Sequence, residues 1–90
     1  MTSVTLEVQI VNPLGMHARP AAQLVKLASQ YASEITIGRN GEVVNAKSIM
    51  GVMMLAAEQG ATVQLAASGT DAEAAIAALA GLIAAGFGEM

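Results

Sequence analysis

The chain has 90 residues, a formal net charge of −3 and no cysteine, and 54% of its residues are hydrophobic although Tyr31 and Phe87 are its only aromatic side chains. This length suits a single domain, residues 1–90, with a core of aliphatic side chains and closely packed alanines. The absence of cysteine excludes disulfides, thiol catalysis and cysteine-based metal sites. The acidic balance argues against nucleic acid as a partner.

The hydropathy pattern also argues against a membrane protein. No apolar stretch reaches the roughly 18–20 uncharged residues that span a bilayer. The first residues lack the basic and apolar regions of a secretory signal. We therefore expect a cytoplasmic protein that does not insert into membranes.

The first half of the chain predicts a strand, a helix and a hairpin. Apolar and polar residues alternate over residues 4–10, which predicts a strand with one buried face. Residues 12–15 form a loop, and from Ala18 to about Gln30 the apolar residues follow a helical period. Asn40-Gly41 then separates two short β-prone runs, and both residues tolerate the positive φ angles of a tight hairpin.

The second half predicts two helices around a fourth strand. Ser48 is a candidate N-cap for a short helix that ends near Gly60, with a buried stripe expected at Ile49, Val52, Met53 and Ala56. Residues 62–67 alternate as a strand. Thr70 and Glu73 have the spacing of a capping box before a final helix that frays near Gly86.

The predicted element order is therefore βαββαβα. Because the hairpin is tight and the helices fall between strands, we expect an α+β open-faced sandwich, with a four-stranded, mostly antiparallel sheet and three helices on one face.

His17 is the residue whose sequence neighbours point most clearly to a chemical role. It lies between a glycine-containing loop and an amphipathic helix, and Pro20 falls in the first turn, where a missing N–H costs nothing. The free amides of Ala18 and Arg19 and the helix dipole favour an anion beside the imidazole ring. With no second histidine and no cysteine to assist, His17 is better suited to hold a transferred group than to act as a hydrolytic base.

Two segments resemble a known family. Gly15-Met16-His17-Ala18-Arg19-Pro20-Ala21 resembles the active-site segment of the HPr family, the phosphocarriers of the phosphoenolpyruvate-dependent phosphotransferase system, and Lys47-Ser48-Ile49-Met50-Gly51-Val52-Met53 resembles its regulatory-serine segment. The resemblance extends over nearly the whole chain. It implies a carrier that accepts a phosphoryl group on His17 Nδ1 from enzyme I and passes it to IIA proteins or domains. It implies neither a cofactor nor a metal.

The resemblance also implies roles for other residues. Arg19 would stabilise the transferring group together with the amide of Ala18, and Ser48 would be phosphorylated where an HPr kinase/phosphorylase is present. The expected partner-docking surface comprises Met16, Gln23, Lys26, Lys47, Ile49, Met50 and Met53. A carrier that presents one face to successive partners is expected to be a monomer.

Three other interpretations of the sequence remain open. The segment around Met53-Met54 also resembles the nitrogen-branch carrier NPr, which has the same chemistry but serves a regulatory cascade. A binding module controlled by phosphorylation of Ser48 would not need His17 at all. An enzyme acting on a small substrate would need a concave pocket, for which a chain of this size leaves little room.

Overall fold

The computed structural model describes residues 2–89. In chain order the elements are β1 (Thr2–Gln9), α1 (Ala18–Ala28), β2 (Glu34–Arg39), β3 (Glu42–Asn45), α2 (Ile49–Met54), β4 (Thr62–Gly69), α3 (Ala72–Ala84) and a 3₁₀ turn, η1 (Gly86–Gly88). The predicted order of strands and helices is confirmed. Among these residues, none of the helices has both the length and the apolar character needed to cross a bilayer.

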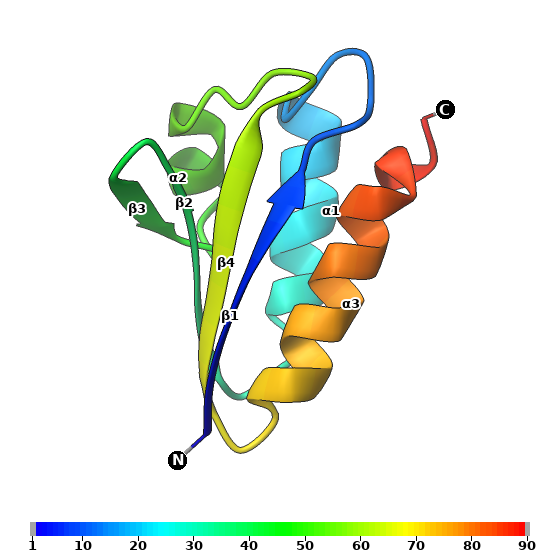
Figure 1. The fold of residues 1–90 in the computed structure, drawn as a ribbon. Coiled ribbons are helices and arrows are strands. Elements are labelled where there is room, and N and C mark those ends of the chain that lie inside the picture. The colour runs from blue at the N-terminus through cyan, green and yellow to red at the C-terminus, as the bar shows by residue number, and fades with distance from the viewer. Residues whose placement is uncertain (1, 90) are drawn as a thin grey trace.

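The four strands form one sheet in the order β1-β4-β2-β3, and every neighbouring pair is antiparallel. β1 pairs with β4 along its full length, from Thr2 opposite Gly69 to Gln9 opposite Thr62. The helices cover one side of the sheet, with α1 and α3 side by side and α2 packed against α1 and β3 (Figure 1). The expected open-faced α+β sandwich is confirmed.

The core lies between the sheet and the helices. In β2 and β4 alternate side chains are buried, at Ile35, Ile37, Val63, Leu65 and Ala67. In α1 the buried residues recur with the helical period, at Ala21, Leu24 and Ala28. The strand period gathers the buried side chains of β2 and β4 on one face of the sheet, and the helical period gathers those of α1 on one face of the helix. These two apolar faces pack against each other.

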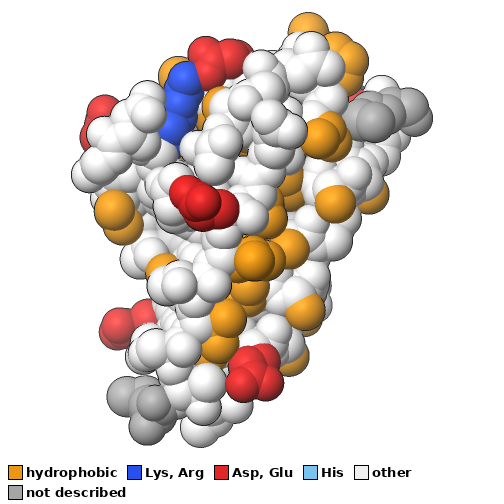
Figure 2. All heavy atoms as spheres, in the orientation of Figure 1, with side chains coloured by type: hydrophobic (Ala, Val, Ile, Leu, Met, Phe, Trp, Pro, Cys, Tyr) orange, Lys and Arg blue, Asp and Glu red, His pale blue; other side chains and the backbone are white. Residues whose placement is uncertain are grey.

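The apolar face of β1 is less buried than the sequence predicts. Leu6 is 43% exposed, and Val4 and Val8 are only half-buried. β1 is an edge strand, and the alanine-rich helix α3 leaves part of this face uncovered. Figure 2 shows apolar side chains along the seam between β1 and α3.

The hairpin between β2 and β3 is confirmed. Asn40 and Gly41 connect the strands with φ angles of 53° and 86°. Positive φ at both central positions is what a two-residue hairpin requires.

The helix α2 is shorter and less buried than predicted. It ends at Met54, and Ala56 then takes a positive φ of 49°, so the predicted end at Gly60 is wrong. Of the predicted stripe, Val52 is buried, but Ile49, Met53 and Ala56 are exposed. Because nearly every position of this helix is apolar, the sequence could not indicate which face points inward.

The predicted capping box of α3 does not form. Asp71 is the N-cap residue and makes no capping hydrogen bond with its side chain. Its carboxylate instead accepts hydrogen bonds from the amides of Ala32 and Ser33, at 2.8 and 2.9 Å, and from the Ser33 hydroxyl. These bonds tie the start of α3 to the connection between α1 and β2.

The C-terminal segment is also better defined than predicted. Beyond α3 the chain does not fray at Gly86 but turns through η1, where Phe87 is 4% exposed and belongs to the core. The Glu89 amide donates to the Gly86 carbonyl at 2.9 Å. The buried phenyl ring therefore anchors Gly88 and Glu89, which follow it.

Candidate functional site

His17 occupies the N-cap position of α1, at the junction of the loop and the helix that the sequence predicts. Its backbone is extended, and its carbonyl accepts the first helical hydrogen bond, from Ala21 at 3.0 Å. The amides of Ala18 and Arg19 come earlier in the chain than this first helical donor, so they have no intrahelical partner. The first turn of α1 contains no acidic residue. This helix start can therefore accept an anion next to the imidazole ring.

The loop before His17 is held against the segment that follows α2. The Met16 amide donates to the Ala57 carbonyl at 2.8 Å. Gly15 has a φ of 65°, and a Cβ atom at this position would lie 2.4 Å from the same carbonyl oxygen. Only glycine allows this close approach, which fixes where the histidine emerges.

Met16 itself does not join the expected docking surface. Its side chain is 4% exposed and belongs to the hydrophobic core. Because it is buried, Met16 cannot present its side chain to a docked partner, contrary to the expectation from the sequence.

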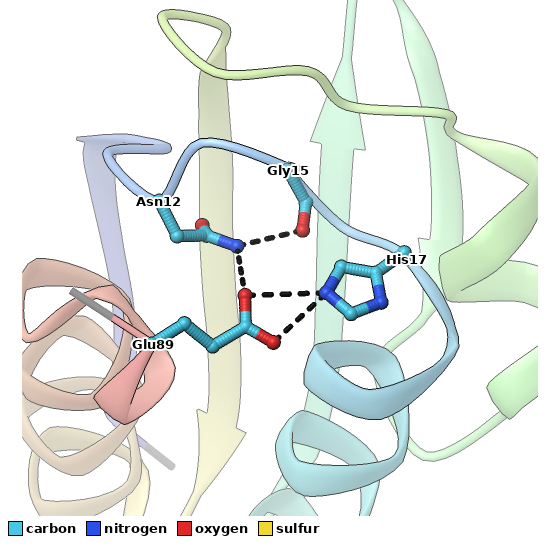
Figure 3. A network of polar contacts seen from close by, with 4 residues as sticks. All are labelled: Asn12, Gly15, His17 and Glu89. Atoms are coloured by element: carbon cyan, nitrogen blue, oxygen red, sulfur yellow. Dashed lines mark hydrogen bonds and ion pairs between the residues drawn. The ribbon is translucent and has the colours of Figure 1, made fainter.

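Glu89 is the nearest charged neighbour of the histidine ring. Its Oε2 and Oε1 atoms lie 2.8 and 3.2 Å from His17 Nε2 (Figure 3). Asn12 Nδ2 donates to Glu89 Oε1 at 2.9 Å and to the Gly15 carbonyl at 2.8 Å. The other ring nitrogen, Nδ1, faces away from Glu89 and toward the first turn of α1 (Figure 3). Glu89 thus links the imidazole ring to Asn12, which in turn is bonded to the loop before His17.

The role of Glu89 and Asn12 at this site was not predicted from the sequence. Glu89 lies 72 positions from His17, and no local pattern connects the two. Asparagine is a residue type that is common in loops, so the identity of Asn12 alone gives no signal. Its complete burial in the structure is what distinguishes it.

Arg19 is exposed in the first turn of α1, beside a surface hollow of about 580 Å³ that is also lined by Leu14, Gln23, Phe87 and Glu89. Within residues 2–89 its guanidinium forms no ion pair. The side chain is therefore free to meet an anion that arrives at the start of α1.

Ser48 is the N-cap of α2, and its Oγ accepts a hydrogen bond from the Gly51 amide at 3.2 Å. The hydroxyl is half-buried. Capping alone is enough to explain a serine at this position.

The exposed side of α2 is strongly apolar. Ile49, Met50, Met53 and Met54 are 44%, 73%, 41% and 71% exposed. α2 packs against α1, the helix that begins at the histidine. An exposed apolar surface of this kind is typical of a protein-binding site.

Two cations of the expected docking surface, Lys26 and Lys47, lie near the C-terminal end of α1. Lys26 lies in the last turn of α1, with Gln23 half-buried one turn earlier. The Lys47 ammonium donates to the Tyr31 carbonyl at 2.8 Å, just beyond the C-terminal end of the same helix. Arg39 is held elsewhere, by the carbonyls of Leu55 and Ala56 and by an ion pair with Glu58. Of the cations, Arg19 is the one placed at the histidine.

Within residues 2–89 there is no group of three or more histidine, aspartate or glutamate side chains that could hold an ion.

A small open-faced α+β domain with a histidine at a helix N-terminus is the architecture of a histidine phosphocarrier. The family model described as the phosphorylation site of the HPr component of the phosphotransferase system matches residues 4–85. The chain therefore belongs to the HPr family, the phosphocarrier proteins of that system.

Individual relatives agree with this membership. The chain is 54% identical over 80 residues to the phosphocarrier protein HPr of Cupriavidus necator, covering 89% of this chain and 90% of the relative. It is 45% identical over 82 residues to HPr of Neisseria meningitidis, covering 91% and 92%.

Solved structures show the same fold. A crystal structure of HPr from Thermoanaerobacter tengcongensis superposes with a TM-score of 0.90 at 49% identity, covering 100% of this chain and 99% of that one. HPr from Bacillus anthracis gives a TM-score of 0.88 at 41% identity, covering 92% and 99%. Another structure of the T. tengcongensis protein is described as a dimer.

Proposed function

We propose that His17 accepts a phosphoryl group on Nδ1 from phosphorylated enzyme I in the cytoplasm and passes it to IIA proteins or domains that serve sugar uptake. The observation that carries this proposal is the position of His17 at the open N-terminus of α1, with a side chain that is 36% exposed. An exposed nucleophile beside unpaired amides is what a group carrier requires.

The chemistry needs little from the carrier beyond positioning. As the Nδ1 lone pair forms the new bond to phosphorus, the bond between phosphorus and the donor breaks, and its electron pair stays with the donor. The Ala18 and Arg19 amides and the Arg19 guanidinium are placed to stabilise the charge on the phosphoryl oxygens. Because each transfer occurs between two docked proteins, the carrier does not need an enclosed pocket.

The test is phosphorylation by enzyme I and phosphoenolpyruvate, with intact mass as the readout. We expect an acid-labile adduct of one phosphoryl group on the wild-type protein and none on the His17→Ala variant. A wild-type protein that stays unlabelled by an enzyme I that phosphorylates another HPr would refute the proposal. So would equal labelling of the variant.

The same assay distinguishes the sugar branch from the nitrogen branch. The 54% identity to a relative named HPr favours the sugar branch. We expect faster phosphorylation by the sugar-branch enzyme I than by its nitrogen-branch counterpart. The opposite order would assign the chain to the nitrogen branch.

Ser48 is the proposed regulatory site. Its hydroxyl lies at the start of α2, where a phosphoryl group would face helix amides, while its charge would enter the apolar docking surface. We expect Ser48→Asp to accept phosphate from enzyme I about tenfold more slowly than Ser48→Ala, with both variants folded. Equal rates for the two variants would leave Ser48 with its capping role alone.

A further inference from the structure

We propose that Glu89 is a positioning residue for phosphoryl transfer, whose carboxylate keeps a proton on His17 Nε2 and so leaves Nδ1 as the nucleophile. The inference rests on the proposed function of His17 and adds a residue from the opposite end of the chain.

The contact itself determines which ring nitrogen carries the proton. An ionised carboxylate can only accept hydrogen bonds, and both Glu89 oxygens lie within 3.2 Å of Nε2. Nε2 must therefore be the donor. In neutral histidine the other nitrogen, Nδ1, then carries the lone pair. It has no hydrogen-bond partner among residues 2–89 and remains open to an incoming phosphoryl group.

The carboxylate is itself held in place from two sides. Asn12 is fully buried, and its Nδ2 has two acceptors, Glu89 Oε1 and the Gly15 carbonyl, so the orientation of the amide is determined by its partners. The η1 turn fixes the backbone of Glu89 through the buried Phe87 and the bond to the Gly86 carbonyl. Glu89 is 18% exposed, so the pair with His17 is shielded from much of the solvent.

A proton held on Nε2 serves both directions of transfer. When Nδ1 bonds to phosphorus, the ring acquires a positive charge, which the adjacent carboxylate stabilises. When the group leaves, the P–Nδ1 bond breaks and its electron pair returns to Nδ1. The departing imidazole is then neutral, because Nε2 has kept its proton. No proton has to be gained or lost in either step.

The carboxylate thus acts on the ring as second-layer carboxylates act on metal-bound histidines, by fixing the tautomer and the orientation. It contacts neither phosphorus nor the phosphoryl oxygens, since it lies on the Nε2 side of the ring (Figure 3).

The test combines a spectroscopic measurement with a kinetic one. ¹⁵N NMR of the His17 ring at about pH 9, well above ordinary imidazole protonation, reports the tautomer. We expect the Nε2–H form in the wild-type protein and an increased Nδ1–H population in Glu89→Ala. We also expect Glu89→Ala to accept phosphate from enzyme I about 10- to 100-fold more slowly, and Glu89→Gln, which keeps an acceptor oxygen, to be intermediate.

Glu73→Ala is the matched control, since it removes an exposed carboxylate from α3 without touching the histidine. Thermal unfolding shows whether each variant is folded. If Glu89→Ala is folded and keeps both the wild-type tautomer and the wild-type rate, the inference is wrong. If the wild-type protein accepts no phosphate, the proposed function fails instead, while the tautomer of Glu89→Ala still decides whether Glu89 orients the ring.

Discussion

The reactivity proposed for His17 depends more on its neighbours than on the residue itself. The unpaired amides of Ala18 and Arg19 lie at the helix start that His17 caps. The Glu89 carboxylate contacts the ring, and the buried Asn12 amide holds that carboxylate. The first two of these groups follow from the local sequence, because a helix that starts at residue 18 must leave them unpaired. The other two come from residues whose approach depends on the complete fold.

Asp71 is a second carboxylate whose role is set by its surroundings. The Ser33 hydroxyl, followed by the Ala32 amide, holds the pKa of this carboxyl below its ordinary value of 3.8. A lowered pKa in the folded state means that the ionised group stabilises the fold. That stabilisation is complete above the unfolded-state pKa and is lost as the pH falls through the folded-state pKa.

We therefore expect Asp71→Asn to unfold at a lower urea concentration than the wild-type protein at pH 7. The gap between their midpoints should close as the pH falls below about 4. Glu73→Gln, in the first turn of the same helix, should show no such gap. A gap for Asp71→Asn that does not change with pH would mean that the charge of Asp71 is not what stabilises the fold.

Among the elements, α2 departs furthest from its predicted form. The buried face of a helix can be predicted when apolar residues recur at every third or fourth position and polar residues occupy the rest. The segment Ile49-Met50-Gly51-Val52-Met53-Met54 has no polar residues to mark its exposed face. The structure buries Val52 and exposes the methionines. Flexible thioether side chains suit a surface that must bind more than one partner.

Replacing one of these methionines should weaken docking without harming the fold. Met50 is 73% exposed on α2, and Val43, on β3, is 66% exposed. We expect Met50→Glu to slow phosphoryl transfer from enzyme I about tenfold and Val43→Glu to leave it unchanged, with similar thermal unfolding of both. Equal effects in the transfer assay would show that α2 is not the docking element.

At the scale of the whole molecule, the sequence predicts the fold well. Every strand, the hairpin at Asn40-Gly41 and the helix that starts at residue 18 follow from periodicity and turn residues. Outside α2, the errors occur where distant parts of the chain compete with local patterns. Asp71 bonds to the segment before β2 instead of allowing a capping box at Thr70, and Phe87 packs into the core instead of fraying.

The pairing of β1 with β4 has a consequence for how the protein is made. Thr2 emerges from the ribosome long before its partner Gly69, and at about 5–20 residues per second β1 waits seconds for its neighbour. Polar residues at every second position protect the strand during that wait. The histidine is translated early, and its carboxylate partner at position 89 follows 72 residues later. A nascent chain therefore exposes His17 before the carboxylate that contacts its ring has been synthesised.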